Sequence, residues 1–276
     1  MNTLGPRTSR PAVVPLRVRS GLALTAVSAV GLVAFGWPFF TDPGSALDNS
    51  HSGDAPLVFV VVLPLLAAVV LSELTSGGMD AKAVAVLGML AAVGAALRAL
   101  GPGAAGLEPS FAVIILGGRV FGRGFGFVLG SITLFVGALL TGGVGPWLPF
   151  QMMAAGWVGF FAGCLPRGGS RFILVGYAVV ASLGYGLVIN LWFWPFASYG
   201  PEVSFVPGAP LLENLHRYLV FDATTSLLWD AGRAVLNGVV LAVAGPALVR
   251  ALRRASRRAA FDVRPEFEPS PGHTPR

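Results

Sequence analysis

The chain alternates between eight long apolar stretches and short polar loops, a pattern that predicts a protein crossing a membrane many times. A helix needs about 20 apolar residues to cross the roughly 30 Å hydrocarbon core of a bilayer, and seven stretches meet or approach this length. The stretch 109–121 is shorter, about 20 Å as a helix, so we expect it to be tilted, partly inserted or continued beyond Arg123. The stretches cover residues 18–40, 56–75, 82–100, 109–121, 124–141, 147–165, 171–195 and 225–249.

The charged residues between these stretches indicate their orientation. Arginine clusters precede the first stretch, separate the fourth from the fifth and the sixth from the seventh, and follow the last. Because arginine and lysine stay on the cytoplasmic side of a membrane, eight crossings place every cluster and both termini in the cytoplasm. We therefore expect residues 1–17 to form a basic cytoplasmic segment and 253–276 a cytoplasmic tail, disordered at its end. The net charge of +6 indicates contact with anionic lipid rather than with nucleic acid.

Common catalytic and metal-binding motifs are missing from the sequence. The only lysine, Lys82, follows an alanine, so the chain has no Gly-Lys-Ser or Gly-Lys-Thr phosphate loop. The histidines lie in expected loops or in the tail and form no His-Glu-x-x-His helix. The single cysteine, Cys164, cannot form a disulfide within the chain or a multi-cysteine metal site. We therefore expect no catalytic residue, no metal and no cofactor, and a chain that is not an enzyme.

Polar side chains inside the apolar stretches are costly in lipid and are usually functional. Asp230, Arg233 and Asn237 are three and four residues apart, which places them on one face of the last helix. They form either an internal ion pair or a ligand site, and the two interpretations are compatible. We expect Asn190 and Gln151, in the seventh and sixth stretches, to face the bundle, where their amides find partners.

Aromatic residues collect on the expected outer side, near Trp147 and Trp192 and along the connection 196–224. One interpretation is an aromatic belt at the membrane interface. The other is an aromatic-lined cup with a few polar groups at its base, as in small-molecule pockets. The connection 196–224 is long for a compact bundle, and its length is typical of a lid or a binding loop.

Small residues recur at one-turn spacing in two of the stretches. Because small side chains let helices approach closely in lipid, these residues serve either packing within the fold or contact with a partner subunit. They are Gly21, Thr25 and Ala29 in the first stretch, and the pairs Ala91/Ala95 and Ala92/Ala96 in the third.

Several motifs follow one another from Ala81 to the end of the chain. The alanine-rich helix leads to the Glu108-Pro109 loop, and then come IILGGRVFGRGFGFVLG (114–130), GPWLPFQM (145–152) and GWVGFFAG (156–163). In this order the motifs resemble the substrate-binding S components of energy-coupling factor (ECF) vitamin transporters. In that family, six helices bind a vitamin near the outer face. The first helix packs on a transmembrane coupling subunit, and two cytoplasmic ATPases drive transport.

The resemblance implies an all-α membrane protein of a prokaryotic plasma membrane. Its S-component-like bundle would occupy residues 81–252, preceded by two extra transmembrane helices in 18–75. The implied partners are a coupling subunit, two ATPase subunits and a small-molecule vitamin, with Ala91 and Ala95 against the coupling subunit. The residues placed near the ligand are Glu108, Trp147, Gln151, Asn190, Trp192, Asp230, Arg233 and Asn237.

The substrate and the role of the extra helices are less constrained. The Gly-Pro-Trp-x-Pro-x-Gln segment is similar to family members assigned to cobalamin, which favours cobalamin over another vitamin, a precursor or a modified base. The extra pair leaves open whether the ladder in the first stretch or that in the third meets the coupling subunit. Two other functions remain as alternatives. A stand-alone secondary carrier or permease subunit should show inverted repeats, and a membrane-embedded lipid enzyme would need Asp230 as its general base.

Overall fold

The computed structural model describes residues 14, 16, 18–40, 67, 68, 70, 79, 81–101, 106–166, 170–196 and 199–258, and all regular structure in this part of the chain is helical. This confirms the all-α prediction. The elements are α1 (Val18–Gly36), η1 (Trp37–Phe40), α3 (Ala81–Ala99), α4 (Ser110–Phe121), α5 (Arg123–Thr141), α6 (Leu148–Ala162), α7 (Arg171–Phe193), η2 (Trp194–Phe196), α8 (Leu211–Thr225), α9 (Leu227–Val243) and α10 (Gly245–Arg258).

Four segments in the described part of the chain are long and apolar enough to cross a membrane: Ser20–Phe39, Ala81–Ala99, Arg123–Thr141 and Arg171–Phe196. Together α8 and α9 also pass as one span, bent by 61° where they meet. The helices α4 and α6 are apolar but shorter. The expected span 56–75 lies outside the described residues, apart from positions 67, 68 and 70.

Two expected boundaries are wrong. The stretch 225–249 is not one helix, because α9 ends at Val243 and α10 begins at Gly245. Pro246 has no backbone N–H and cannot continue a helix from the preceding turn, but it suits the first turn of a new one. The connection 196–224 is not an open loop either, since it contains α8. Residues 253–258 of the expected tail belong to α10, and 259–276 lie outside the described residues.

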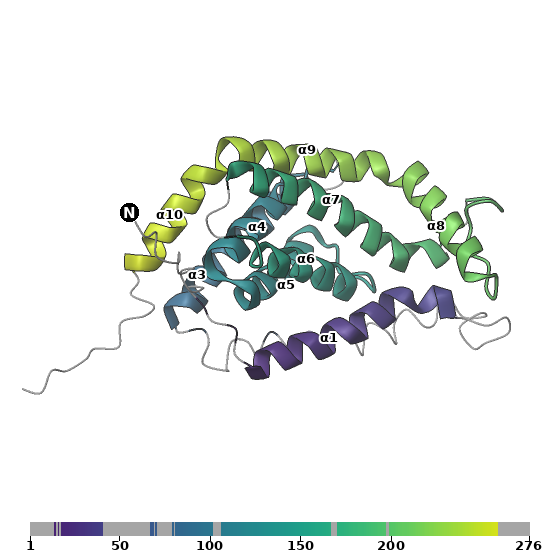
Figure 1. Cartoon of the computed structure of the whole chain (residues 1–276), viewed down its shortest axis with the longest axis horizontal. Helices are drawn as coiled ribbons and strands as arrows, with labels where there is room; N and C mark the ends of the chain where they lie inside the picture. The colour runs from purple at the N-terminus through teal and green to yellow at the C-terminus, as the bar shows by residue number, and fades with distance from the viewer. Residues whose placement is uncertain are drawn as a thin grey trace, which may run out of the picture.

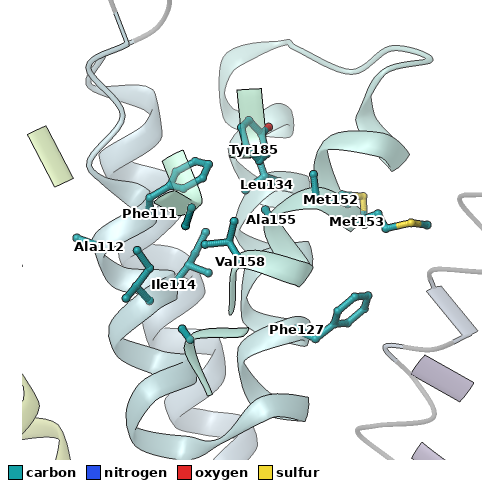
Figure 2. Close-up of a cluster of buried hydrophobic side chains, with 14 of the residues drawn as sticks. Phe111, Ala112, Ile114, Phe127, Leu134, Met152, Met153, Ala155, Val158 and Tyr185 are labelled. Carbon is teal, nitrogen blue, oxygen red and sulfur yellow. The ribbon is translucent and has the colours of Figure 1, made fainter. Parts of the chain in front are cut away.

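The core of the bundle is formed by α4, α5 and α6, which pack against one another more closely than ordinary side chains allow. A Cβ added to Gly126 would collide with the carbonyl oxygen of Gly159, and one added to Gly159 with that of Gly126. The backbones of α5 and α6 therefore touch, as small residues permit between helices in lipid. Figure 2 shows Phe111 and Ile114 of α4 facing Ala155 and Val158 of α6 within this core.

The first helix lies along one long side of the molecule and α9 along the other, with α4 to α7 between them (Figure 1). The side chain of Phe35 on α1 packs on the rings of Phe150 and Trp157, with centroids 5.0 Å and 5.8 Å away. Nearer the middle of α1, Ser28 Oγ accepts a hydrogen bond of 2.9 Å from Trp157 Nε1. These contacts join α1 to α6, while much of its remaining surface is exposed.

Candidate functional site

A cavity of about 370 Å³ opens where α3 and α5 end and where α6 and α9 begin. With the orientation that the arginines predict, these helix ends lie at the outer face. The segment after α3 and the middle of α7 complete the wall. The lining residues are Arg98, Gly101, Gly106, Leu107, Glu108, Thr141, Gln151, Tyr185, Ile189, Trp229 and Arg233.

Charged side chains of alternating sign form one wall of this cavity. Glu108 Oε1 accepts a hydrogen bond of 2.8 Å from Arg98, and Glu108 Oε2 accepts one of 3.2 Å from Arg233. Arg233 Nη1 also donates to Asp230 Oδ1, at 2.6 Å. Arg98 Nη2 donates to Gln151 Oε1, at 3.0 Å. Each charge in this wall thus has a partner of opposite sign, as a buried ion needs in order to be tolerated.

The inner half of this network is tightly enclosed. The Arg233 guanidinium lies over the ring of Tyr185, 4.9 Å from its centroid, and over that of Phe111, at 5.3 Å. Such cation–π contacts add to its ion pairs. Asp230 is pressed against Gly186 of α7, where any Cβ would overlap the carboxylate. The side chains of Asp230 and Arg233 are only 6% and 8% exposed, whereas Arg98 and Glu108 reach 18% and 16%.

The segment that precedes α4 packs closely on α9, where Gly106 allows the contact and Asn237 holds the segment by hydrogen bonds. Gly106 has a φ of +75°, and a side chain there would strike the carbonyl oxygen of Trp229. Asn237 Oδ1 accepts a hydrogen bond of 2.8 Å from the backbone N–H of Ala112, which also donates to the carbonyl oxygen of Pro109 at 3.1 Å. Its Nδ2 donates to the carbonyl oxygens of Glu108 and Arg233, at 3.0 Å and 2.9 Å.

The structure brings five of the eight expected ligand-site residues together. Glu108, Gln151 and Arg233 line the cavity. Asp230 and Asn237 are buried directly behind it, where they hold Arg233 and the segment before α4. Their side chains therefore position the cavity wall and do not form its surface.

The other three expected residues lie apart from the cavity lining. Asn190 Nδ2 donates to Asp222 Oδ1 at 2.7 Å and so links α7 to α8. Trp192 packs on Trp147 and on Phe150, with ring centroids 6.2 Å and 5.8 Å apart. The outer aromatics thus pack mainly on one another, and the aromatic lining of the cavity comes from Tyr185 and Trp229.

The most important cavity residue outside the expected set is Arg98. It stands in the last turn of α3, ten positions before its partner Glu108. An arginine at the end of an apolar stretch resembles an ordinary flanking charge, yet this one falls at the expected outer end, where flanking arginines are rare. That position was the available signal. Tyr185 and Thr141 carry no comparable signal, because single hydroxyl groups are common in such stretches.

The small residues of α3 divide between two faces. Ala91 and Ala95, expected to meet a partner, are buried within the chain, 2% and 0% exposed. They belong to the face of α3 that packs on α5 and α4. Ala92 and Ala96, one position further along, are exposed. A partner can reach these two without displacing α3.

No group of three or more histidine, cysteine, aspartate or glutamate side chains that could hold a metal occurs among the residues the structure describes. The charges around the cavity are paired with each other instead. The polar side chains that line the cavity include those of Arg98, Glu108, Gln151, Thr141, Tyr185 and Arg233.

The comparisons with known proteins identify the family of the chain. The model of one protein family, described as ECF transporter, substrate-specific component, matches residues 82–251. The match covers more than half of the chain, begins at α3 and leaves α1 outside it. No curated protein and no solved structure matches the chain. The chain therefore belongs to the family of substrate-specific components of ECF transporters.

Proposed function

We propose that this membrane protein captures one small, polar organic micronutrient in the cavity between Arg98, Glu108 and Gln151. The observation that supports the proposal is a cavity of about 370 Å³ with a charged wall at the expected outer end of the bundle. This volume lies at the lower end of the roughly 300–1,000 Å³ typical of small-molecule sites.

The chemistry of the lining favours a ligand with carboxylate, amide or hydroxyl groups. Arg98 donates a hydrogen bond to Gln151, and both side chains are partly exposed, so a ligand oxygen can replace Gln151 Oε1 as the acceptor for Arg98. Tyr185 and Trp229 offer ring faces and edges to an apolar or aromatic part of the same molecule.

Cobalamin, favoured by the sequence, is the bulkiest candidate. Even drug-sized ligands occupy sites of up to about 1,000 Å³, and a corrinoid is larger than these. Cobalamin binding therefore requires the cavity to open well beyond its 370 Å³. A compact vitamin or precursor fits this volume better, and we propose it ahead of cobalamin.

Transport then depends on other subunits. We propose that a separate transmembrane coupling subunit and two cytoplasmic ATPases act with this chain in a prokaryotic plasma membrane, with both termini in the cytoplasm. The exposed Ala92 and Ala96 on α3 are a better candidate for the coupling-subunit contact than the buried Ala91 and Ala95. The bundle would occupy residues 81–252, with 18–75 as an addition to it.

The alternative of a lipid enzyme receives little support from the site. Asp230, its only general-base candidate, is buried, paired with Arg233 and packed against Gly186. A general base must lie within hydrogen-bond reach of the proton it removes, and Asp230 is not among the residues that line the cavity.

The deciding experiment is mass spectrometry of small molecules released from the detergent-purified full chain after expression in rich medium. We expect one enriched micronutrient, which should also raise the thermal unfolding temperature of the emptied protein. Arg217→Ala serves as a control variant that should keep the bound micronutrient, because Arg217 pairs with Glu213 on α8 and does not line the cavity. An empty protein with no thermal shift against a vitamin panel, combined with ion-driven uptake by this chain alone in liposomes, would instead show a carrier.

A further inference from the structure

A second hollow, of about 660 Å³, separates α1 from the bundle and shares no lining residue with the cavity described above. One wall belongs to α1, and the other to α5, α6 and α7. We call it the α1 groove. Its walls are mainly apolar and include Leu22, Thr25 and Leu32 on α1 and Phe127, Trp157 and Phe160 on the bundle.

The polar atoms inside the α1 groove already have partners. Thr25 Oγ1 donates to the carbonyl oxygen of Gly21 at 2.9 Å, and Trp157 Nε1 donates to Ser28 Oγ at 2.9 Å. The exception is Arg123, the first residue of α5, which lines one end of the groove and is exposed. In the described part of the chain, no carboxylate lies within ion-pair distance of Arg123.

The α1 groove is long enough for a lipid chain. Its lining on α1 runs from Val18 to Leu32, which is about 21 Å along a helix. One leaflet of the hydrocarbon core is about 15 Å deep. An apolar hollow left empty loses its dispersion contacts, and water does not enter the hydrocarbon region readily, so hydrocarbon is the natural filling.

The charge at the end of the groove selects the headgroup. The arginine distribution places Arg123 at the cytoplasmic surface, where anionic lipids concentrate and each basic residue gains about 1 kcal/mol from them. A zwitterionic lipid carries its own positive group, so its net attraction to Arg123 is weaker than that of an anionic lipid. We propose that the α1 groove binds one anionic membrane phospholipid, with an acyl chain between α1 and the bundle and its phosphate on Arg123.

The described residues offer no competing occupant from this chain. Val70, the described residue of the 56–75 stretch with known packing, contacts a cluster that contains Ala83, Leu87, Phe121 and Phe125. That cluster shares no residue with the α1 groove. The proposed lipid joins α1 to the bundle, and because its site is separate from the ligand cavity, the proposal stands apart from the identity of the micronutrient.

The test uses the full chain in nanodiscs made from equal amounts of phosphatidylglycerol and phosphatidylcholine, followed by native mass spectrometry of the released protein. We expect the wild type to retain one phosphatidylglycerol in preference to phosphatidylcholine. Arg123→Gln should reduce this retention by about fivefold, and its exposed position makes it harmless to folding. The control is Arg171→Gln, another exposed arginine at the start of a helix, which lies outside the groove.

A second variant tests the acyl-chain position. Thr25→Trp fills the groove and should also reduce phosphatidylglycerol retention, whereas Val30→Trp, on an exposed position of α1 outside the groove, should not. Equal retention of the two lipids by the wild type, or undiminished retention by Arg123→Gln, would overturn the proposal. Cross-linking of residues 41–66 into the groove of the native protein would also overturn it, because the chain itself would then be the occupant.

Discussion

The cavity at the outer end of the bundle and the α1 groove share three helices, α5, α6 and α7, but offer opposite chemistry. On α6, Gln151 faces the cavity, while Trp157 and Phe160 face the groove. On α7, Tyr185 lines the cavity and Val188 the groove. The cavity owes its polarity mainly to residues at helix ends and to the segment before α4. The groove is apolar on both sides, because leucines of α1 face aromatic side chains of the bundle.

This difference separates the part of the molecule that the family model matches from α1, which lies outside the match. Every cavity residue lies within the matched region 82–251, whereas half of the groove belongs to α1, outside it. The core beneath the cavity tolerates almost no change in volume, because backbones touch there. The contact between α1 and the bundle is looser, and changes there should leave the cavity intact.

The largest effect is expected at the crossing of α7 and α9. Gly186→Leu should destabilise the fold by about 3–5 kcal/mol, because the new side chain displaces Asp230 and breaks its buried pair with Arg233. Thermal unfolding of the purified protein, followed by tryptophan fluorescence, measures this. Gly184→Leu is the control on the same helix, since a side chain there meets open space. Equal unfolding temperatures for the two variants would contradict the crossing geometry.

The next effect concerns the open side of the charge network. Arg98→Ala should weaken binding of the co-purified micronutrient by about 10- to 100-fold, because a hydrogen bond to a charged group contributes about 1.5–3 kcal/mol. Titration of the emptied protein measures the affinity. Arg217→Ala removes an exposed pair on α8 and should leave the affinity unchanged. If both variants lose affinity to the same extent, Arg98 does not contact the ligand.

A smaller effect is expected on subunit assembly. Ala92→Trp combined with Ala96→Trp should reduce co-purification of the coupling subunit by about tenfold, or about 1.4 kcal/mol, because the bulky side chains keep the helices apart. Ala91→Trp should instead lower the unfolding temperature, since Ala91 is buried within the chain. Unchanged co-purification with the double variant would exclude this face of α3.

The smallest effect is expected at α1. Ser28→Ala removes the acceptor of the Trp157 hydrogen bond and should lower stability by about 1 kcal/mol. Micronutrient affinity should not change, because neither residue lines the cavity. Thermal unfolding and ligand titration on the same preparation measure both quantities. A lower affinity in this variant would show that α1 and the cavity are coupled more closely than their separate walls indicate.

The helices were more predictable from the sequence than their ends. The segments Ser20–Phe39, Ala81–Ala99, Arg123–Thr141 and Arg171–Phe196 follow the expected apolar stretches closely, because a membrane span must be apolar around its whole circumference. Helix α8 mixes leucines with charged and amide side chains, so hydropathy alone did not reveal it. The break before α10 depends on one proline within a stretch that still reads as apolar.

The site residues that could be predicted from the sequence are those of an unusual type for their surroundings. Charges such as Glu108 and Arg233 stand out beside apolar stretches, and the structure places both in the cavity wall. Arg98 occupies the end of a stretch and resembles a flanking charge, and only its place at the expected outer end distinguishes it. Trp147 and Trp192 were expected at the cavity because they are aromatic and outer. The spacing of residues along one helix shows which face of that helix a side chain occupies, but not which side chain of another helix it contacts. Trp147 and Trp192 pack on each other.

The charges of the cavity wall have a consequence for the speed of capture. Two arginines and two carboxylates, Arg98, Arg233, Glu108 and Asp230, sum to zero net charge. A cluster with no net charge produces little electric field outside the cavity, so it does not steer a distant charged solute toward the cavity. Association should then proceed at the unsteered rate of about 10⁵–10⁶ M⁻¹s⁻¹ and depend little on ionic strength. Under the proposed function, the protein would meet its ligand by unsteered diffusion and select it only after contact.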